Sequence, residues 1–254
     1  MSTTTLPLSG RTAIVTGGSR GIGLAIARAL LESGANVAVA ARKQPALDAA
    51  AEALARFGDR LLTVSVNVGQ AGDRERLVAA TTERFGGLDI LVNNAAANPV
   101  YGKVEDTEPW AFDKIMQVNV AAPFELAKLA LPHLTKRDTS HIVNVSSIGG
   151  LRPEPGLGIY SVSKAALNSL TKVMAREWGP RGVHVNGICP GLIKTDFSEA
   201  LWSDDKTAAH LTRNTPLQRI GAPEDIGAAV LALVSSAGAY MSGHILVADG
   251  GYTV

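Results

Sequence analysis

The sequence predicts a doubly wound α/β domain, with about seven parallel strands and helices on both faces of the sheet. Short apolar runs alternate with longer helical patterns along the whole chain. The short runs are apolar at nearly every position rather than at every second one, which is typical of strands buried on both faces. A glycine-rich loop separates the first run from the first helix, at the place where such sheets bind nucleotides.

Each strand is expected where an apolar run is bounded by glycine or polar residues. In chain order, the expected strands cover residues 11–16, 36–41, 61–66, 88–93, 141–145, 183–188 and 245–247. Helices are expected between them, at residues 24–33, 45–57, 73–85, 107 to about 134, 159–178 and 223–235.

Glycine and proline mark several of the helix ends. Gly34 and Gly179 supply stop signals for the first and fifth helices, and Pro223 stands at the start of the last one. Pro123 predicts a kink or break within the fourth helix. Residues 192–215 form a long, partly helical excursion that is long enough to close over a substrate as a lid.

Composition limits the kinds of partner. The 254 residues carry a net charge of +1 and are 46% hydrophobic, which suits a single globular domain covering residues 1–254. A charge so close to zero argues against nucleic acid or an anionic membrane as the main partner. Cys189 is the only cysteine, so an internal disulfide is excluded and a reducing compartment is favoured. The five histidines show no metal-ligand spacing, and we expect no metal site.

Neither terminus predicts targeting, and we expect a cytoplasmic protein. The start, MSTTTLPLSG, lacks the regions of a signal peptide, and the end, GGYTV, is no peroxisomal signal. Residues 226–248 contain no charged side chain and are long enough to span a bilayer. Serine and glycine interrupt this segment, however, which indicates a buried helix, a turn and a buried strand.

The glycine loop at residues 17–23 predicts a dinucleotide site. Its spacing, Gly17-x3-Gly21-x-Gly23, places three glycines between a strand and a helix, where backbone N–H groups face a pyrophosphate. A merely structural glycine turn is the alternative. The loop has no Gly-Lys-Ser/Thr sequence, which argues against a mononucleotide P-loop.

The end of the second strand predicts which dinucleotide binds. An acid at this position would hold the ribose hydroxyls and repel a 2′-phosphate. Here Ala40 and Ala41 are followed by Arg42 and Lys43, and Arg20 lies in the glycine loop. Two arginines could hold a 2′-phosphate through charge-assisted hydrogen bonds, although each could also be a solvated surface charge. We therefore expect NADP(H), with NAD(H) as the alternative.

Residues 144–164 carry the candidate catalytic groups. Tyr160 and Lys164 are spaced i, i+4, so they lie one turn apart on the same face of a helix. A nearby ammonium group favours the phenolate and lowers the pKa of a tyrosine. A serine at the end of the preceding strand could hold a substrate oxygen beside the phenol. On its own, this spacing more often reflects ordinary helix packing.

In combination, these motifs resemble the short-chain dehydrogenase/reductase family, a Rossmann-type fold, over essentially the whole chain. The matching stretches are Thr16-Gly17-x3-Gly21-Ile22-Gly23, Asn93-Asn94-Ala95, Asn119, Ser147, Tyr160-x3-Lys164 and Pro190-Gly191. Within the family, the sequence is most similar to NADPH-dependent carbonyl reductases, and 3-oxoacyl-thioester reductases are a near second.

The resemblance implies a role for each catalytic candidate. Tyr160 would be the general acid that protonates a carbonyl oxygen, and the general base in the reverse direction. Ser147, rather than Ser146, would polarise the carbonyl. Lys164 would lower the pKa of Tyr160 and bind the nicotinamide ribose. Asn119 would hold a water that relays protons to Lys164, although a mid-helix asparagine could instead cap a local bend.

The resemblance also implies which residues bind the cofactor. The expected set is Gly17, Ser19, Arg20, Gly21, Ile22, Gly23, Arg42, Lys43, Asn67, Val68, Asn93, Ala95, Tyr160, Lys164, Pro190, Gly191, Ile193 and Thr195. Two positions depart from the usual pattern of the family. Ala96 replaces a glycine near the ribose, and Asn67 replaces the aspartate that often meets the adenine.

The expected substrate is a hydrophobic ketone or aldehyde. The loops beyond the strand ends offer an apolar mouth formed by Leu151, Leu157, Leu192, Phe197, Leu201 and Trp202. Lys194 and Arg152 are the possible cations for an acidic substrate. A homotetramer is expected from the resemblance, through the two long helices and the last strand.

Two other functions stay open at this point. One is an NAD-dependent dehydrogenase for a secondary alcohol or steroid, against which the missing acid after the second strand argues. The other is an NADPH-sensing scaffold without turnover. A scaffold would be expected to lose Ser147, Tyr160 or Lys164, and all three are present.

Overall fold

The computed structural model describes residues 6–203 and 205–254. Seven strands form one sheet in the order β3-β2-β1-β4-β5-β6-β7, and every neighbouring pair is parallel. The strands are β1 (Thr12–Thr16), β2 (Asn36–Ala41), β3 (Leu61–Ser65), β4 (Ile90–Asn93), β5 (Ser140–Val145), β6 (Val183–Pro190) and β7 (Ile245–Ala248). The predicted doubly wound sheet is confirmed. The domain prediction covered residues 1–254, of which 1–5 and 204 lie outside the described residues.

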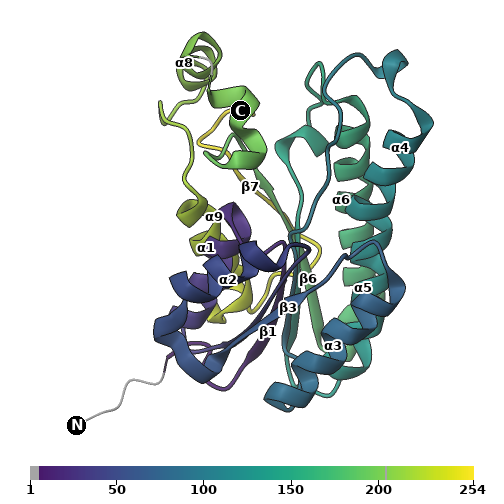
Figure 1. The fold of residues 1–254 in the computed structure, drawn as a ribbon, viewed down its shortest axis with the longest axis vertical. Helices are drawn as coiled ribbons and strands as arrows, with labels where there is room; N and C mark the ends of the chain where they lie inside the picture. Colours follow the sequence, from purple (N-terminus) through teal and green to yellow (C-terminus); the bar gives the residue numbers. More distant parts are fainter. Residues whose placement is uncertain (1–5, 204) are drawn as a thin grey trace.

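Helices cover both faces of this sheet (Figure 1). One face carries α1 (Gly21–Glu32), α2 (Gln44–Ala53) and α9 (Pro223–Val234), and the other carries α3 (Ala71–Phe85), α4 (Pro109–Met116), α5 (Ala122–Leu134) and α6 (Gly158–Trp178). Each layer has its own apolar core, because side chains of β1 alternate between the two. Val15 belongs to the apolar cluster that contains Ile26 and Ile226, whereas Ile14 belongs to the one that contains Leu77 and Leu126.

The predicted helix at residues 107–134 is broken, as Pro123 suggested. It consists of α4 and α5, joined by a π-helical turn at Gln117–Ala121. Proline has no N–H for the helical ladder, and its ring crowds the carbonyl four residues earlier. In this chain that carbonyl belongs to Asn119, which lies within the turn. The π turn therefore contains a buried polar residue, Asn119.

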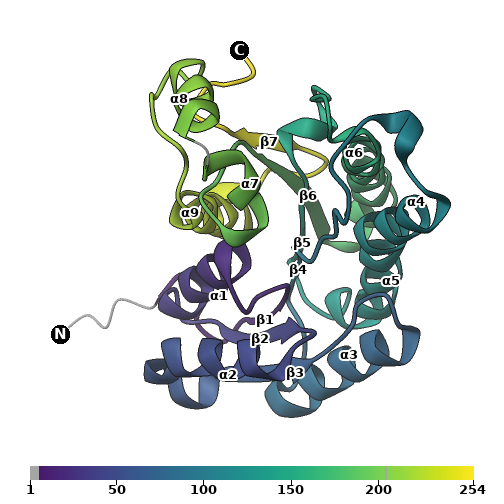
Figure 2. The same cartoon turned by 45° about the horizontal axis from the view of Figure 1, so that its top comes forward.

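The excursion after β6 is partly helical, as expected. It contains a short 3₁₀ turn (Asp196–Ser198), α7 (Glu199–Trp202) and α8 (Asp205–Arg213). In Figure 2, α7 and α8 lie beside β7 and the C-terminal tail, at the same end of the molecule. This segment and the tail therefore come together beyond the carboxyl ends of the strands.

The uncharged segment 226–248 has the predicted arrangement of helix, turn and strand. It contains most of α9, a 3₁₀ turn at Ser236–Gly238 and the strand β7. Among the described residues, no helix combines the length and the apolar character that crossing a membrane requires.

Candidate active site

One cavity of about 1340 Å³ follows the carboxyl ends of the strands. It runs from the glycine loop, past the ends of β2 and β4, to α6 and the tail that follows β7. Most of the residues predicted from the sequence line it: Gly17, Ser19, Arg20, Gly21, Ile22, Gly23, Arg42, Lys43, Asn67, Val68, Ala95, Ser147, Tyr160, Lys164, Pro190, Gly191, Ile193 and Thr195. Asn93 and Asn119 do not line it.

The glycine loop presents an uncapped helix end to this cavity. Arg20 is the N-cap residue of α1, yet its side chain makes no capping hydrogen bond, and the first turn of α1 holds no acidic residue. A Cβ on Gly23 would lie 2.2 Å from the carbonyl oxygen of Gly17, and Gly17 itself has a φ of +63°. A side chain at Gly23 would collide with the backbone of Gly17, so only glycine fits here. Without side chains in the way, the backbone N–H groups at this helix end can face an anion.

Asn94 holds this loop in place, a role that the sequence analysis missed. Its Nδ2 donates to the carbonyl oxygens of Thr16 at 2.8 Å and Gly17 at 3.1 Å. The Thr16 hydroxyl in turn accepts the backbone N–H of Asn94 at 3.0 Å. Asn93, which was expected beside the cofactor, is buried and donates to Oδ1 of Asn144 at 2.9 Å. Alternation along β4 explains the difference, because neighbouring side chains of a strand point to opposite faces.

Ser147, Tyr160 and Lys164 come together at the middle of the cavity. The Lys164 ammonium lies 5.6 Å from the centre of the Tyr160 ring and donates to the Val145 carbonyl at 2.8 Å. The Ser147 hydroxyl accepts the N–H of Gly149 at 3.0 Å and also forms a hydrogen bond with Tyr160, so its hydrogen points to the oxygen that would react. Ser146 instead uses its hydroxyl on the Lys164 carbonyl at 3.1 Å. The geometry thus favours Ser147 over Ser146 as the donor to a ligand.

Burial shifts the two titrating groups of this cluster. It raises the pKa of Tyr160 to about 12, an effect that hydrogen bonding with Ser147 opposes. Burial also lowers the pKa of Lys164 to about 8. Tyr160 is therefore a neutral phenol at physiological pH, and the pKa of Lys164 lies closer to neutrality than that of an exposed lysine. The expected lowering of the Tyr160 pKa by Lys164 stays a prediction.

Asn119 lies behind the cavity and ties three segments together. Its Oδ1 accepts the N–H of Ala97 at 2.8 Å, and its Nδ2 donates to the Ala97 carbonyl and to the Ser163 hydroxyl, both at 3.0 Å. The side chain is 1% exposed. Its side chain therefore connects the π turn to the loop that follows β4 and to α6.

The substrate end of the cavity agrees only in part with the expected apolar mouth. Leu157, Leu192, Phe197 and Leu201 line it, whereas Leu151 and Trp202 do not. Lys194 and Arg152 do not line it either. The residues that the sequence analysis missed include Leu217, Asp249 and Tyr252. The rule that ligands bind beyond the strand ends applies to β7 as well, so it could have pointed to Asp249 and Tyr252.

Cys189, His133, His141, His184 and His244 do not line this cavity. The Cys189 side chain is buried, and burial raises the pKa of its thiol, which is typical of an inert packing residue. Among the described residues, no group of histidine, cysteine, aspartate and glutamate has the arrangement of a metal site.

Comparison with known proteins assigns the chain to a family. A family model described as enoyl-(acyl carrier protein) reductase matches residues 17–253. The human dehydrogenase/reductase SDR family member 4 is 42% identical over 245 residues, which cover 96% of this chain and 88% of the relative. The human mitochondrial SDR family member 2 is 40% identical over 243 residues, covering 96% of this chain and 86% of the relative.

Solved structures of proteins that are 31% and 33% identical to this chain have the same fold. A Pseudomonas aeruginosa RhlG/NADP active-site complex superposes with a TM-score of 0.91 at 33% identity, covering 98% of this chain and 99% of the other. A Brucella melitensis short-chain dehydrogenase/reductase superposes with a TM-score of 0.91 at 31% identity, covering 98% and 99% of the two chains. The chain thus belongs to the short-chain dehydrogenase/reductase family and is an NAD(P)(H)-dependent oxidoreductase that acts on small molecules.

Proposed function

We propose that this enzyme reduces a ketone or aldehyde to the alcohol with NADPH, and that Tyr160 is its general acid. One observation carries the proposal. The same cavity of about 1340 Å³ holds the uncapped N-terminus of α1 and the Ser147–Tyr160–Lys164 cluster. This volume exceeds that of a typical pocket for one small ligand, and it suits a dinucleotide with a substrate beside it.

The residues present fit a dinucleotide. The pyrophosphate would lie against the N-terminus of α1, where glycine clears the space that a Cβ would fill. Arg20, Arg42 and Lys43 would meet a 2′-phosphate, and Lys164 would bind the ribose next to the nicotinamide. The Asn67 side-chain oxygen already accepts the N–H of Gly69 at 3.1 Å, and a second lone pair remains for the adenine amino group. A bound nicotinamide would supply the hydride.

The protein side of the reaction follows from the protonation states. Ser147 would donate its hydroxyl hydrogen to the carbonyl oxygen of the substrate, in place of the hydrogen bond with Tyr160, and polarise it. Tyr160, neutral because burial raises its pKa, would give its proton to the same oxygen. The nearby Lys164 ammonium would stabilise the phenolate that remains. Asn119 would hold a water that returns a proton, and its side chain would also position α6.

The choice of NADPH rests on the end of β2. Arg42 and Lys43 follow this strand directly and line the cavity, and no acid stands there to repel a phosphate. One of the similar structures carries NADP in its title. These observations support NADPH over NADH, which stays the alternative cofactor for an alcohol or steroid dehydrogenase.

The substrate class rests on the lining of the other end. Leu157, Leu192, Phe197 and Leu201 give this end an apolar wall, which supports a hydrophobic carbonyl compound. Arg219 also lines the cavity, but Asp225 binds it at 2.6 Å and 2.9 Å. A 3-oxoacyl thioester is the second candidate substrate, because the matching family model is described as enoyl-(acyl carrier protein) reductase, and acyl carrier proteins hold acyl groups as thioesters.

We also propose a cytoplasmic homotetramer. Apolar side chains are exposed on α4, α5, α6 and β7: Trp110 is 59%, Val162 51% and Val173 47% exposed. Association through these elements would cover them. A monomer peak in light scattering at micromolar concentration would contradict this proposal, and fractionation of the tagged protein tests the location.

Turnover assays test the proposed reaction. The loss of NADPH or NADH absorbance is followed with aromatic ketones, diketones, long-chain aldehydes and 3-oxoacyl thioesters. We expect turnover with at least one hydrophobic carbonyl compound and a higher kcat/KM with NADPH. A higher kcat/KM with NADH would contradict the cofactor assignment, and turnover of thioesters alone would favour the second candidate.

A further inference from the structure

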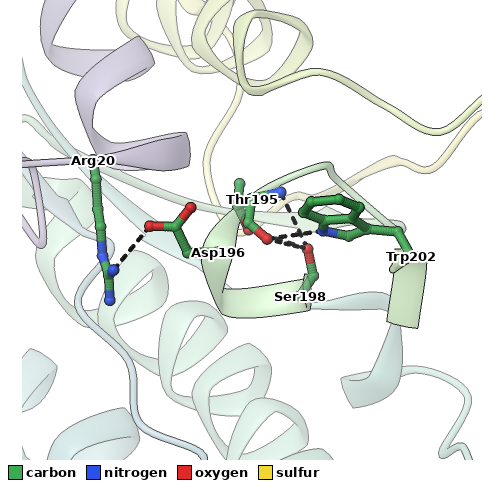
Figure 3. Close-up of polar contacts among 5 residues, drawn as sticks. All are labelled: Arg20, Thr195, Asp196, Ser198 and Trp202. Atoms are coloured by element: carbon green, nitrogen blue, oxygen red, sulfur yellow. Dashed lines mark hydrogen bonds and ion pairs between the residues drawn. The ribbon is translucent and has the colours of Figure 1, made fainter. Parts of the chain in front are cut away.

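An ion pair joins the glycine loop to the segment after β6 (Figure 3). Nη1 of Arg20 lies 2.9 Å from Oδ2 of Asp196, and the two side chains are 69% and 68% exposed. Both residues line the cavity. A carboxylate therefore holds one of the cations that would meet the cofactor phosphate.

The position of Asp196 is fixed by its neighbours rather than by the ion pair alone. Thr195 caps the short turn that begins at Asp196, where the Ser198 hydroxyl accepts the N–H of Thr195 at 3.3 Å. The Trp202 indole donates to the Thr195 carbonyl at 2.9 Å, as Figure 3 shows. Just before the turn, Lys194 donates its N–H to the Gly221 carbonyl at 2.9 Å. The carboxylate is thus presented from a turn that is tied at both ends.

A second contact keeps this turn against the glycine loop. A Cβ on Gly21 would lie 3.1 Å from Cγ2 of Thr195, and Gly21 has a φ of +52°. The two segments therefore touch at Gly21 and Thr195, the direct neighbours of Arg20 and Asp196. This contact between the two segments places Arg20 and Asp196 near each other, so the ion pair does not depend on the conformations of the two side chains alone.

Arg20 differs in this respect from the other two cations of the cofactor site. Within the described part of the chain, neither Arg42 nor Lys43 forms an ion pair. A phosphate monoester carries between one and two negative charges at neutral pH and has three acceptor oxygens, so a guanidinium binds it more strongly than a single exposed carboxylate. The pair with Asp196 is exposed and therefore weak. A 2′-phosphate would have to displace this carboxylate or share the guanidinium with it.

We propose that Asp196 is a positioning residue that reduces the preference for NADPH by competing with the 2′-phosphate for Arg20. The carboxylate weakens the binding of NADPH and leaves that of NADH unchanged, because NADH has no 2′-phosphate. The inference rests on the proposed use of Arg20 for NADP(H). It makes the preference for NADPH in this protein smaller than its three cations alone would give.

Binding of NADPH and of NADH to four variants tests the inference by fluorescence titration. The variants are the wild type, Asp196→Asn, Arg20→Ala and the double substitution. We expect Asp196→Asn to lower the Kd of NADPH by about two- to fivefold, the range that an exposed ion pair typically contributes, and to leave the Kd of NADH unchanged. In the Arg20→Ala background, the same substitution is expected to have no effect.

Asp59→Asn is the matched control. It removes the carboxylate of another exposed ion pair, that of Arg84 and Asp59, whose members do not line the cavity. Neither Kd is expected to change in this variant. The inference is overturned if Asp196→Asn weakens NADPH, changes both cofactors equally or acts without Arg20. Each of these results would mean that the acid acts through the fold of the turn or through the field of the whole site.

The same titration separates the inference from the proposed function. A wild type that binds NADH more tightly than NADPH would contradict the proposed cofactor. If Asp196→Asn still strengthened NADPH alone in such a protein, the competition for Arg20 would stand. A wild type that prefers NADPH with no change in Asp196→Asn would overturn the inference and leave the proposed function intact.

Discussion

Burial shifts the pKa values of Tyr160 and Lys164 in opposite directions, and each shift favours the neutral form. For Tyr160 this is the state that a general acid needs for carbonyl reduction, because its pKa of about 12 keeps the phenol protonated. For Lys164 the pKa of about 8 places the loss of its charge just above physiological pH. A pH profile should therefore report mainly on the lysine.

We predict that kcat/KM for carbonyl reduction falls as the pH rises above about 8. Lys164 loses its proton there, and a neutral amine no longer stabilises the Tyr160 phenolate that forms when the proton is given away. The measurement is a pH–rate profile of the wild type, with Lys172→Arg, an exposed lysine on the same helix, as the control. A profile that stays level up to about pH 10 would show that the charge of Lys164 does not matter.

Single residues also show how far sequence reasoning reaches. The i, i+4 spacing of Tyr160 and Lys164 was sufficient to place them together, because a helix fixes that geometry. Asn94 was missed because its role depends on contacts with Thr16 and Gly17, which are 78 and 77 positions away in the chain. The ion pair of Arg20 with Asp196 spans 176 positions and was equally beyond a local pattern.

At the level of elements, the break at Pro123 has the clearest consequence. The π turn places Asn119 where its side chain joins Ala97 to Ser163. The sequence predicted a kink because proline has one physical effect in any helix. It did not predict the π form of the turn or the partners of Asn119, since both depend on the strand end and helix that pack against it.

We predict that Asn119→Leu lowers the free energy of unfolding by about 2–5 kcal/mol. The substitution leaves the N–H and the carbonyl of Ala97 without these partners, and each unpaired buried group costs about 1–3 kcal/mol. Urea denaturation gives the value. Ser163→Ala is the matched control, because it removes one of the three hydrogen bonds of Asn119, together with the bond of Ser163 to the Tyr160 carbonyl, and should cost about 1–2 kcal/mol. Equal losses in the two variants would contradict the structural role of Asn119.

At the level of the whole molecule, the order of the strands decides where the site lies. Seven parallel strands end at one edge, so loops from the entire chain meet in one cavity. The alternation of strands and helices predicted this arrangement. The sequence did not predict that the C-terminal tail lines the cavity. The path of this tail depends on the Asp249 carboxylate, which accepts hydrogen bonds from the N–H groups of Gly251 and Thr253, and these contacts have no recognisable sequence pattern.

Stability at acidic pH is a property of the whole fold that depends on His141. This β5 residue is 7% exposed, and its ring lies 5.1 Å from that of His184 on β6. Burial, together with the charges of His184 and Arg11, lowers its pKa to about 4. Because the folded value lies below the unfolded value of about 6.5, the unfolded state binds the proton first as the pH falls.

We predict that the free energy of unfolding is insensitive to His141 above about pH 6.5 and falls as the pH drops toward 4, by up to about 3 kcal/mol in total. His141→Asn should remove this part of the slope in urea denaturation at a fixed protein concentration. The control is His133→Asn, because His133 is more exposed and its pKa is less strongly lowered. If the slope of His141→Asn equals that of the wild type, His141 is not the group that titrates.

The most direct test of the account is the effect of Tyr160→Phe on NADPH binding and on carbonyl turnover, measured on the same preparation. The substitution removes one hydroxyl from a ring that also packs against Phe197, with the ring centres 6.2 Å apart, so the cavity should keep its shape. We predict that Tyr160→Phe still binds NADPH, because the other residues of the expected cofactor set are unchanged, and that its kcat is at least about 100-fold lower, the usual contribution of a general acid. Full turnover in Tyr160→Phe would contradict the assignment of Tyr160 as the proton donor, and with it the proposed reaction mechanism.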